Sequence, residues 1–276
     1  MRTTNRKSLW AGPYSGEFGF EIMTWQANIR RLGRGYDVTV GCKPTSRALY
    51  ADFTDKFWDV PHGTSASENT SGCKRMDDGD RAIVRNFRGD MPSNANYIRP
   101  QIFFPSKGTF ISYGNKRHGS AYDVVFHARY MMKGGDHRRS APMEWWDELA
   151  GGIYGLSIAC IGLKSCSLTL PMATDLRDIP LTETMDILAS SRCIVGPSSG
   201  PIHLATLCGC PQVVWTDTTH VGGYDKKSNV HKLEQYWNPF GIPTRIHHTS
   251  EKDSDKKYWL PDLRWVQMNI HEMMAR

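Results

Sequence analysis

The chain has 276 residues, enough for one large domain or two small ones, and its 39% hydrophobic and 22% charged residues are typical of a soluble globular protein. No apolar run approaches the roughly 20 residues of a membrane span, and none near the N-terminus suits a secretory signal, so we expect no integral membrane association. The formal net charge of +6 is compatible with a phosphate-bearing partner, but a surplus of this size also occurs in proteins that bind no polyanion.

The seven cysteines predict a reducing environment. They are odd in number and several lie in apolar, strand-like runs, which favours buried thiols over a disulfide framework. Cys208 and Cys210 lack the spacing and the second ligand pair of a structural zinc site, so we interpret them as core residues. The expectation is a cytoplasmic protein without a metal site.

Strand and helix patterns alternate at the start of the chain. The segment SLWAGP predicts a short strand before a glycine-rich turn, and apolar residues at helical spacing between Ile22 and Leu32 predict a helix that ends at Gly33. Residues 36–42 predict a buried strand, and residues 45–53 predict a helix capped by Thr45 or Ser46. From residue 61 to about 120 the periodicity fades, and we expect irregular structure with an added strand or two.

The second half shows a longer alternation of strands and helices. Strands are predicted at residues 122–129, 156–162, 192–196 and 212–215, and helices at residues 142–150, 181–190 and 201–208. This order predicts a parallel sheet covered on both faces, a Rossmann-type domain starting near residue 120. Residues 258–276 predict a last helix, which we expect to pack back on the N-terminal half.

The loop after the strand at residues 192–196 has the composition of an anion site. Ser198, Ser199 and Gly200 leave backbone N–H groups with little side-chain obstruction, and Pro201 suits the first turn of a helix. A helix N-terminus carries roughly half a positive charge, which favours a bound phosphate. His203 lies in the first turn and can donate to the same spot. The alternative is that Ser199 only caps the helix and His203 bonds a backbone carbonyl.

A second loop, after the strand at residues 122–129, is strongly basic. Arg129, Lys133, Arg138 and Arg139 follow the strand and precede a helix, and two glycines give the loop reach. Ligands of open parallel sheets bind beyond the carboxyl ends of the strands, and arginine forks match phosphate oxygens. A charge run is usually a solvated face, but this position favours a functional role for Arg129 and Arg139.

The stretch from Gly196 to Trp215, GPSSGPIHLATLCGCPQVVW, resembles the signature of heptosyltransferase-like glycosyltransferases of the GT-B fold. Their pattern is a strand, an acid or serine, Ser or Thr followed by Gly, a spacer, His-Leu-Ala, and a proline before the next strand. The similarity continues in the same order through the strand at Tyr122, PMEWWDELA, the strand ending at Gly162, and residues 178–196. It covers most of residues 120–215.

This resemblance implies an α/β protein of the GT-B class, with two Rossmann-like domains around a central cleft and an irregular N-terminal domain. The implied parts are an acceptor-side domain at residues 1–120, a nucleotide-sugar-binding domain at residues 121–257, and a terminal helix at residues 258–276. The implied enzyme is a glycosyltransferase whose C-terminal domain binds the nucleotide diphosphate of its sugar donor.

The resemblance also implies which residues bind the donor. Those carried over to the donor phosphates are Ser198, Ser199, Gly200, His203, Arg129 and Arg139, and those near the base and ribose are Gly162, Ile179, Thr182 and Glu183. Lys133 of the basic loop is added as a further donor-binding candidate. The family often has Asp where this chain has Pro197 or Ser198, but a role that depends on backbone N–H groups survives that change. No cofactor is implied beyond the donor, a UDP-, ADP- or GDP-sugar. GDP is included because HAR at residues 127–129 is similar to the His-x-Arg of fucosyltransferases.

An acid just before the first helix completes the resemblance. GPYSGEFGFEIMTW places Glu17 where these enzymes carry an aspartate that acts as general base, and Glu21 lies one turn later. Sugar transfer with inversion needs a base for the attacking hydroxyl, and fixed N–H groups and arginines can stabilise the leaving diphosphate without a metal. We expect Glu17 to be the base, with Glu21 as the second candidate. The alternative is that Glu17 and Glu21 have no catalytic role and only interact favourably, as negative charges, with the positive N-terminus of the helix.

The acceptor is less well defined by the sequence. Basic residues between positions 61 and 120 are interleaved with aromatic ones, a pattern that suits phosphate contacts and base stacking in a nucleic acid. The basic residues are Lys74, Arg75, Arg81, Arg85, Arg88, Arg99, Lys107, Lys116 and Arg117, and the aromatic ones are Phe87, Tyr97, Phe103, Phe104 and Tyr113. Viral enzymes of this architecture add sugars to hydroxymethylated pyrimidines in DNA, which would place this chain in a host cytoplasm. A lipopolysaccharide or other glycan core is the competing acceptor, and a sugar-nucleotide epimerase or a non-catalytic binding protein are alternatives of other classes.

Overall fold

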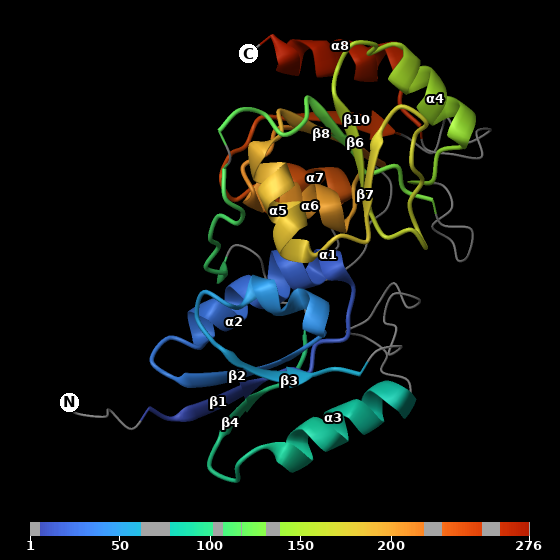
Figure 1. The fold of residues 1–276 in the computed structure, drawn as a ribbon. Coiled ribbons are helices and arrows are strands. Elements are labelled where there is room, and N and C mark those ends of the chain that lie inside the picture. Colours follow the sequence, from blue (N-terminus) through green and yellow to red (C-terminus); the bar gives the residue numbers. More distant parts are fainter. Residues whose placement is uncertain are drawn as a thin grey trace. The chain divides into compact units, whose positions relative to one another are not determined.

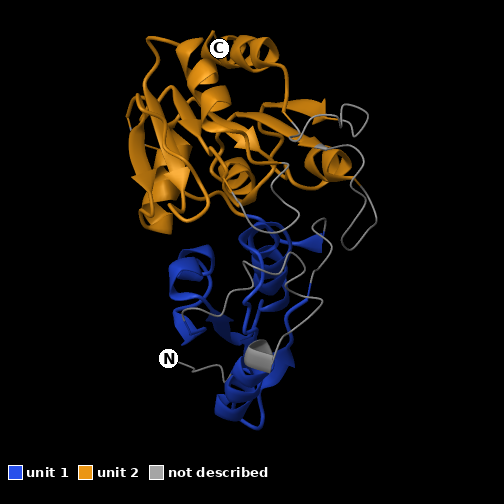
Figure 2. Cartoon of the chain, turned by 90° about the vertical axis from the view of Figure 1, so that its right-hand side faces the viewer, with its two compact units in different colours: residues 1–110 blue, residues 111–276 orange. Residues whose placement is uncertain are grey.

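A computed structural model of the chain describes residues 6–61, 78–101, 107–116, 118–130, 139–217, 228–249 and 260–275. The chain divides into two compact units, residues 1–110 and residues 111–276 (Figure 2). Each unit contains a parallel sheet of its own, which confirms the predicted α/β class. Across the described ranges, no helix combines the length and apolar character needed to cross a membrane.

Unit 1 is built on a four-stranded parallel sheet in the order β3-β2-β1-β4 (Figure 1). Its strands are β1 (Ser8–Ala11), β2 (Asp37–Cys42), β3 (Lys56–Asp59) and β4 (Asn96–Ile98). Its helices are α1 (Phe18–Phe20), the π-helix η1 (Glu21–Trp25), α2 (Gln26–Leu32), the 3-10 helix η2 (Pro44–Leu49) and α3 (Asp78–Asp90). The predicted strands at the start of the chain are confirmed as β1 and β2.

Both faces of this sheet are covered by helices (Figure 1). On one face Ile22, Trp25 and Ile29 of the η1–α2 segment are fully buried. On the other, the buried ring of Phe87 in α3 lies 5.1 Å from that of Trp10 and 5.3 Å from that of Trp58, centroid to centroid. The N-terminal half is therefore more regular than the sequence predicts, because a few large aromatic contacts hold α3 in place without a long apolar stripe.

The helix predicted over residues 45–53 is wrong in type and in its cap. The structure has the shorter 3-10 helix η2, with Lys43 at the N-cap position and Pro44 in the first turn. Ser46 does not cap this helix, because its hydroxyl donates to Oε2 of Glu21 at 3.0 Å. The Ser46 hydroxyl, which the sequence pattern assigns to the helix N-terminus, therefore binds the buried carboxylate of Glu21 instead.

Unit 2 contains a six-stranded parallel sheet in the order β10-β9-β8-β5-β6-β7 (Figure 1). Its strands are β5 (Val124–Phe126), β6 (Ile158–Gly162), β7 (Thr174–Arg177), β8 (Cys193–Pro197), β9 (Gln212–Asp217) and β10 (Thr244–Thr249). Its helices are α4 (Met143–Gly151), α5 (Leu181–Ser190), α6 (Gly200–Leu207), α7 (Asn229–Gln235) and α8 (Leu263–Met274). The predicted alternation is confirmed, and the strands β7 and β10 extend the sheet at its two edges.

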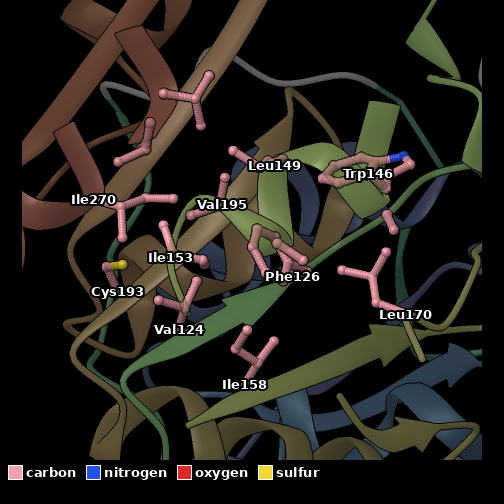
Figure 3. Packing of buried hydrophobic residues seen from close by; sticks show 14 of the residues in the cluster. Val124, Phe126, Trp146, Leu149, Ile153, Ile158, Leu170, Cys193, Val195 and Ile270 are labelled. Carbon is pink, nitrogen blue, oxygen red and sulfur yellow. The ribbon is translucent and has the colours of Figure 1, made fainter. Parts of the chain in front are cut away.

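One face of this sheet packs against α4 and α8, which lie side by side (Figure 1). Figure 3 shows Phe126 and Val195 of the strands in one buried cluster with Trp146 of α4 and Ile270 of α8. The terminal helix was expected to pack on the N-terminal half, but its apolar face is buried in the core of unit 2. Burial of a large apolar side chain contributes about 1.5–3 kcal/mol, which favours this placement.

The cysteines that the structure describes are Cys42, Cys160, Cys166, Cys193, Cys208 and Cys210. All six carry free thiols, and all but the half-buried Cys166 are buried. The interpretation of Cys208 and Cys210 as core residues is confirmed by their burial. Cys73 lies outside the described residues.

The parallel arrangement of unit 2 brings three strand ends together. Phe126 near the end of β5 pairs with Cys160 of β6 on one side and with Val195 of β8 on the other. Carboxyl ends of parallel strands share one edge of the sheet, where ligands of open α/β sheets bind. The segments that follow β5, β6 and β8 therefore form the candidate site.

Candidate functional site

The β8–α6 loop leaves backbone donors at the start of α6. The N–H of Ser198 continues the sheet by donating to the carbonyl of Trp215 at 2.9 Å, and Ser199 is the extended N-cap residue. The first bond inside the helix runs from the N–H of His203 to the carbonyl of Ser199 at 3.1 Å. The N–H groups of Gly200 and Ile202 precede it, so neither has a carbonyl partner within the helix. Because Gly200 is only half-buried, this helix start can accept an anion.

The hydroxyl of Ser199 does not cap α6. Its Oγ lies 2.8 Å from Nδ1 of His127, the residue that follows β5, and no side-chain cap is formed. The alternative interpretation of Ser199 as a simple helix cap is therefore wrong. His127 is buried, and burial, assisted by the charges of Arg129 and Arg139, lowers its pKa to about 3. The imidazole is thus neutral at physiological pH.

Two arginines bring positive charge to this loop. Nη1 of Arg139 donates to the carbonyl of Ser198 at 2.8 Å. Arg129 is buried, its backbone N–H donates to the carbonyl of His127 at 2.8 Å, and its charge helps to lower the pKa of His127. The structure therefore brings Arg129 and Arg139 together with Ser198 and Ser199 at one edge of the sheet. Lys133 lies outside the described residues.

His203 makes a tilted aromatic contact beside the same helix start. Its ring centroid lies 4.5 Å from that of Trp237, and Nζ of Lys232 lies 5.8 Å from the Trp237 ring. Burial and the charge of Arg139 lower the pKa of His203 to about 3, so this imidazole is also neutral. Among the described residues, Nδ1 of His203 has no hydrogen-bond partner, and it is the buried polar atom of this loop that a ligand could satisfy.

Trp237 and Lys232 belong to this neighbourhood but were missed by sequence reasoning. Both lie within or just after α7, and Lys232 is only 2% exposed. No motif or spacing links them to the β8–α6 loop, because they follow it by more than 30 residues and Trp237 meets His203 of α6 only in the folded unit. The one available signal is the content of nine tryptophans, a residue type that often builds cores or lines binding sites.

The residues predicted near the base and ribose separate into two groups. Gly162 adopts a φ of +123° at the end of β6, and its carbonyl accepts from the N–H of Asp178 at 2.8 Å. Ile179 is the next residue after Asp178, so it also lies near this strand end. Thr182 and Glu183 are exposed in the first turn of α5. Glu183 lines a pocket of about 240 Å³ with residues 118–122, and no residue of the β8–α6 loop lines that pocket.

The two candidate bases in unit 1 have different surroundings. Glu17 is half-buried at the N-cap of α1 and makes no side-chain cap bond, while its carbonyl accepts from the hydroxyl of Tyr14 at 3.1 Å. Glu21 is only 2% exposed, and its two oxygens accept from Tyr50 at 2.7 Å and Ser46 at 3.0 Å. An attacking hydroxyl can reach Glu17 more readily, so Glu17 remains the first candidate.

The burial of Glu21 has a consequence for stability. Burial raises its pKa from 4.5 to about 7, against the smaller lowering effects of Tyr50, Ser46 and Lys43. Between these two pH values the folded state holds a proton that the unfolded state has lost, so the free energy of unfolding falls as pH rises. We expect the titration of Glu21 to lower the free energy of unfolding by about 3 kcal/mol across that pH range.

Urea unfolding at a series of pH values, with wild type and Glu21→Gln compared, measures this contribution. Glutamine does not titrate, and its amide can accept from one hydroxyl and donate to the other, so the loss should vanish in the variant. The difference between the two proteins isolates Glu21, because the neutral His127 and His203 make stability rise with pH between about 3 and 6.5. Equal pH slopes in the two proteins would contradict the assignment.

The aromatic residues expected to stack on nucleic-acid bases are largely core residues. Phe87 and Tyr113 are buried, and Tyr97 is half-buried with the guanidinium of Arg88 5.5 Å from its ring. Arg85 and Arg88 are exposed on α3. The described part of this surface thus supports phosphate contacts more than base stacking. Lys74, Arg75, Phe103, Phe104 and Arg117 lie outside the described residues.

No protein-family model matches the chain, and no curated protein matches it. Solved structures do match, over nearly the whole chain. A family 9 glycosyl transferase from Veillonella parvula gives a TM-score of 0.56 at 11% identity, covering 98% of this chain and 97% of its own. The E. coli ADP-heptose lps heptosyltransferase II gives 0.56 at 12% identity, covering 98% of each chain. The E. coli heptosyltransferase WaaC with ADP gives 0.52 at 11% identity, covering 96% and 99%. The chain therefore has the α/β fold of these heptosyltransferase-like GT-B glycosyltransferases, as its motifs predict.

Proposed function

We propose that the chain is a glycosyltransferase that moves a sugar from a nucleotide-sugar donor to a hydroxyl acceptor with inversion. The observation that carries the proposal is the start of α6, where the N–H groups of Gly200 and Ile202 lack helical partners beside Arg139. Backbone donors and a guanidinium at the carboxyl edge of a parallel sheet match the charge and shape of a diphosphate.

The donor diphosphate would be held by these groups without a metal ion. Negative charge grows on the diphosphate as the glycosidic bond breaks, and donors already fixed in place stabilise it at little reorganisation cost. Arg129 and Arg139 supply the positive charge that a divalent cation would otherwise provide. The neutral imidazole of His203 can donate one further hydrogen bond to a phosphate oxygen.

Glu17 would act as the general base. Direct attack of a hydroxyl on the anomeric carbon inverts its configuration, and the hydroxyl proton must leave as the new bond forms. A half-buried carboxylate at the end of a glycine-rich loop is accessible to an acceptor. The surroundings of Glu21 support a structural role for that residue.

ADP-sugars are the first donors to test. Two of the similar structures are a heptosyltransferase named for ADP-heptose and one solved with ADP. UDP- and GDP-sugars remain alternatives, because the contacts proposed above involve the diphosphate rather than the base. A cytoplasmic location is proposed from the free buried thiols, and it would be a host cytoplasm if the acceptor is viral DNA.

For the acceptor we propose an anionic polymer that presents a hydroxyl group. DNA with hydroxymethylated pyrimidines is one candidate, supported by the exposed Arg85 and Arg88 of α3 and by the net charge of +6. A lipopolysaccharide or glycan core is the second, supported by the likeness of fold to an lps heptosyltransferase.

A panel of ADP-, UDP- and GDP-sugars against hydroxymethylated DNA and glycan cores, with mass spectrometry as the readout, tests this proposal. We expect one pairing to gain the mass of a sugar residue with release of the nucleoside diphosphate. Nucleotide-sugars incubated without an acceptor identify an epimerase, which would convert the sugar itself. Absence of transfer in every pairing would contradict the proposed function.

A further inference from the structure

We propose that His127 is a positioning residue of the donor site, which holds the Ser199 hydroxyl away from the start of α6 and so keeps the first N–H groups of that helix available to a diphosphate. This inference depends on the proposed function, because it concerns the same anion site. His127 itself need not touch the ligand. It acts through Ser199.

The N-cap position of α6 is occupied by a residue that normally closes such a site. A serine at an N-cap usually accepts a hydrogen bond from an N–H of the second or third helical residue. In α6 the second helical residue is Pro201, which has no N–H, so Ile202 is the remaining donor. A serine hydroxyl that turned toward Ile202 would compete with a phosphate oxygen for this N–H group.

The structure shows this hydroxyl engaged elsewhere. Oγ of Ser199 lies 2.8 Å from Nδ1 of His127, and the helix has no side-chain cap. Because His127 follows β5 while Ser199 follows β8, the contact links two neighbouring strand ends. The hydrogen bond therefore fixes the rotamer of Ser199 with a group outside the helix.

The position of His127 is itself tightly determined. A Cβ atom on Gly162 would lie 3.0 Å from Cδ2 of His127, and one on Gly196 would lie 2.8 Å from its carbonyl oxygen. Side chains at these two positions would push against His127, so both glycines make room for it. With 4% of its surface exposed, the imidazole has little freedom to leave Ser199.

The protonation state of His127 suits this role. A neutral imidazole has one N–H donor and one acceptor nitrogen, so Nδ1 can pair with a hydroxyl in either direction. A charged imidazole would be a cation that binds the diphosphate directly. Neutral His127 therefore contributes through the position of Ser199, and the arginines supply the charge.

Titration calorimetry of the full chain with ADP, UDP and GDP tests the inference. His127→Leu, which removes the polar atom at similar size, should weaken the best-bound nucleotide by about tenfold, since an N-cap bond of roughly this strength would have to be displaced. His127→Asn should retain most of the affinity, because its amide can reach the Nδ1 position. His127→Ala serves as a second variant if the leucine variant does not fold.

The decisive variant is the double substitution His127→Leu with Ser199→Ala. Without a hydroxyl at position 199 nothing can cap Ile202, so the double variant should bind the nucleotide as tightly as Ser199→Ala alone. A structural role of His127 would instead persist in the double variant, and thermal unfolding of each protein checks for that. Unchanged affinity in His127→Leu, or no recovery of affinity in the double variant, would overturn the inference. In that case nucleotide binding by the wild type would still support the proposed donor site. Failure of the wild type to bind any of the three nucleotides would overturn both.

Discussion

Replacement of Glu17 by Gln should lower the turnover number for sugar transfer by about 10²–10⁴-fold, the range attributed to a general base. Glutamine cannot take the proton of the acceptor hydroxyl, although it has nearly the same shape as glutamate. The affinity for the nucleoside diphosphate should remain within about twofold, because the groups proposed to bind it lie in another unit of the chain. Steady-state kinetics and calorimetry on the same preparation separate the two effects.

Glu21→Gln is the matched control for this prediction. It changes the same chemical group four residues later, but Glu21 is buried against Tyr50 and Ser46. We expect a much smaller loss of turnover than in Glu17→Gln. If Glu21→Gln abolished transfer while Glu17→Gln remained active, Glu21 would be the base and the assignment would be wrong.

Arg139→Ala should reduce kcat/KM by about 10²–10³-fold, as expected when one donor that stabilises developing negative charge is removed. The guanidinium of Arg139 donates to the carbonyl of Ser198, so its loss removes both positive charge and a contact that holds the β8–α6 loop. Because the diphosphate is more negative in the transition state than in the bound donor, kcat should fall more than KM rises. Initial-rate kinetics over a range of donor concentrations measure this split.

Two controls distinguish this effect from a general loss of charge. Arg139→Lys keeps the charge but not the forked donor, and we expect it to recover only part of the activity. Arg245→Ala removes a half-buried arginine that pairs with Glu272 at 3.2 Å in unit 2, and it should leave kcat/KM unchanged. Equal losses in Arg139→Ala and Arg245→Ala would contradict a specific role for Arg139.

The second half of the fold could be predicted from its sequence because its signals are local. Strands such as residues 193–197 are continuous apolar runs, and the helices that follow them begin after prolines or small residues. The first half gave weaker signals. Helix α3 contains three arginines and three aspartates, and of its residues 81–90 only Ile83 and Phe87 are buried. Its place is determined by aromatic contacts with Trp10 and Trp58, which belong to strands far from α3 in the sequence. The periodicity of apolar residues within the helix does not reveal such contacts.

The same distinction holds for the candidate site. The β8–α6 loop and Arg139 could be predicted because each follows a strand and precedes a helix. The pairing of Ser199 with His127 spans 72 residues, and the tilted ring contact between Trp237 and His203 joins two elements that no motif connects. The burial of Glu21 also depends on Tyr50, which is brought to it by the 3-10 helix η2 and its exit. Contacts of this range become visible only in the folded unit.

The most direct test of the central claim is a crystal structure of the chain with a bound nucleoside diphosphate. The account predicts a diphosphate at the start of α6, with its oxygens within hydrogen-bond distance of the Gly200 and Ile202 N–H groups and close to His203. A diphosphate bound elsewhere in the chain, with these N–H groups covered by packed side chains, would contradict it.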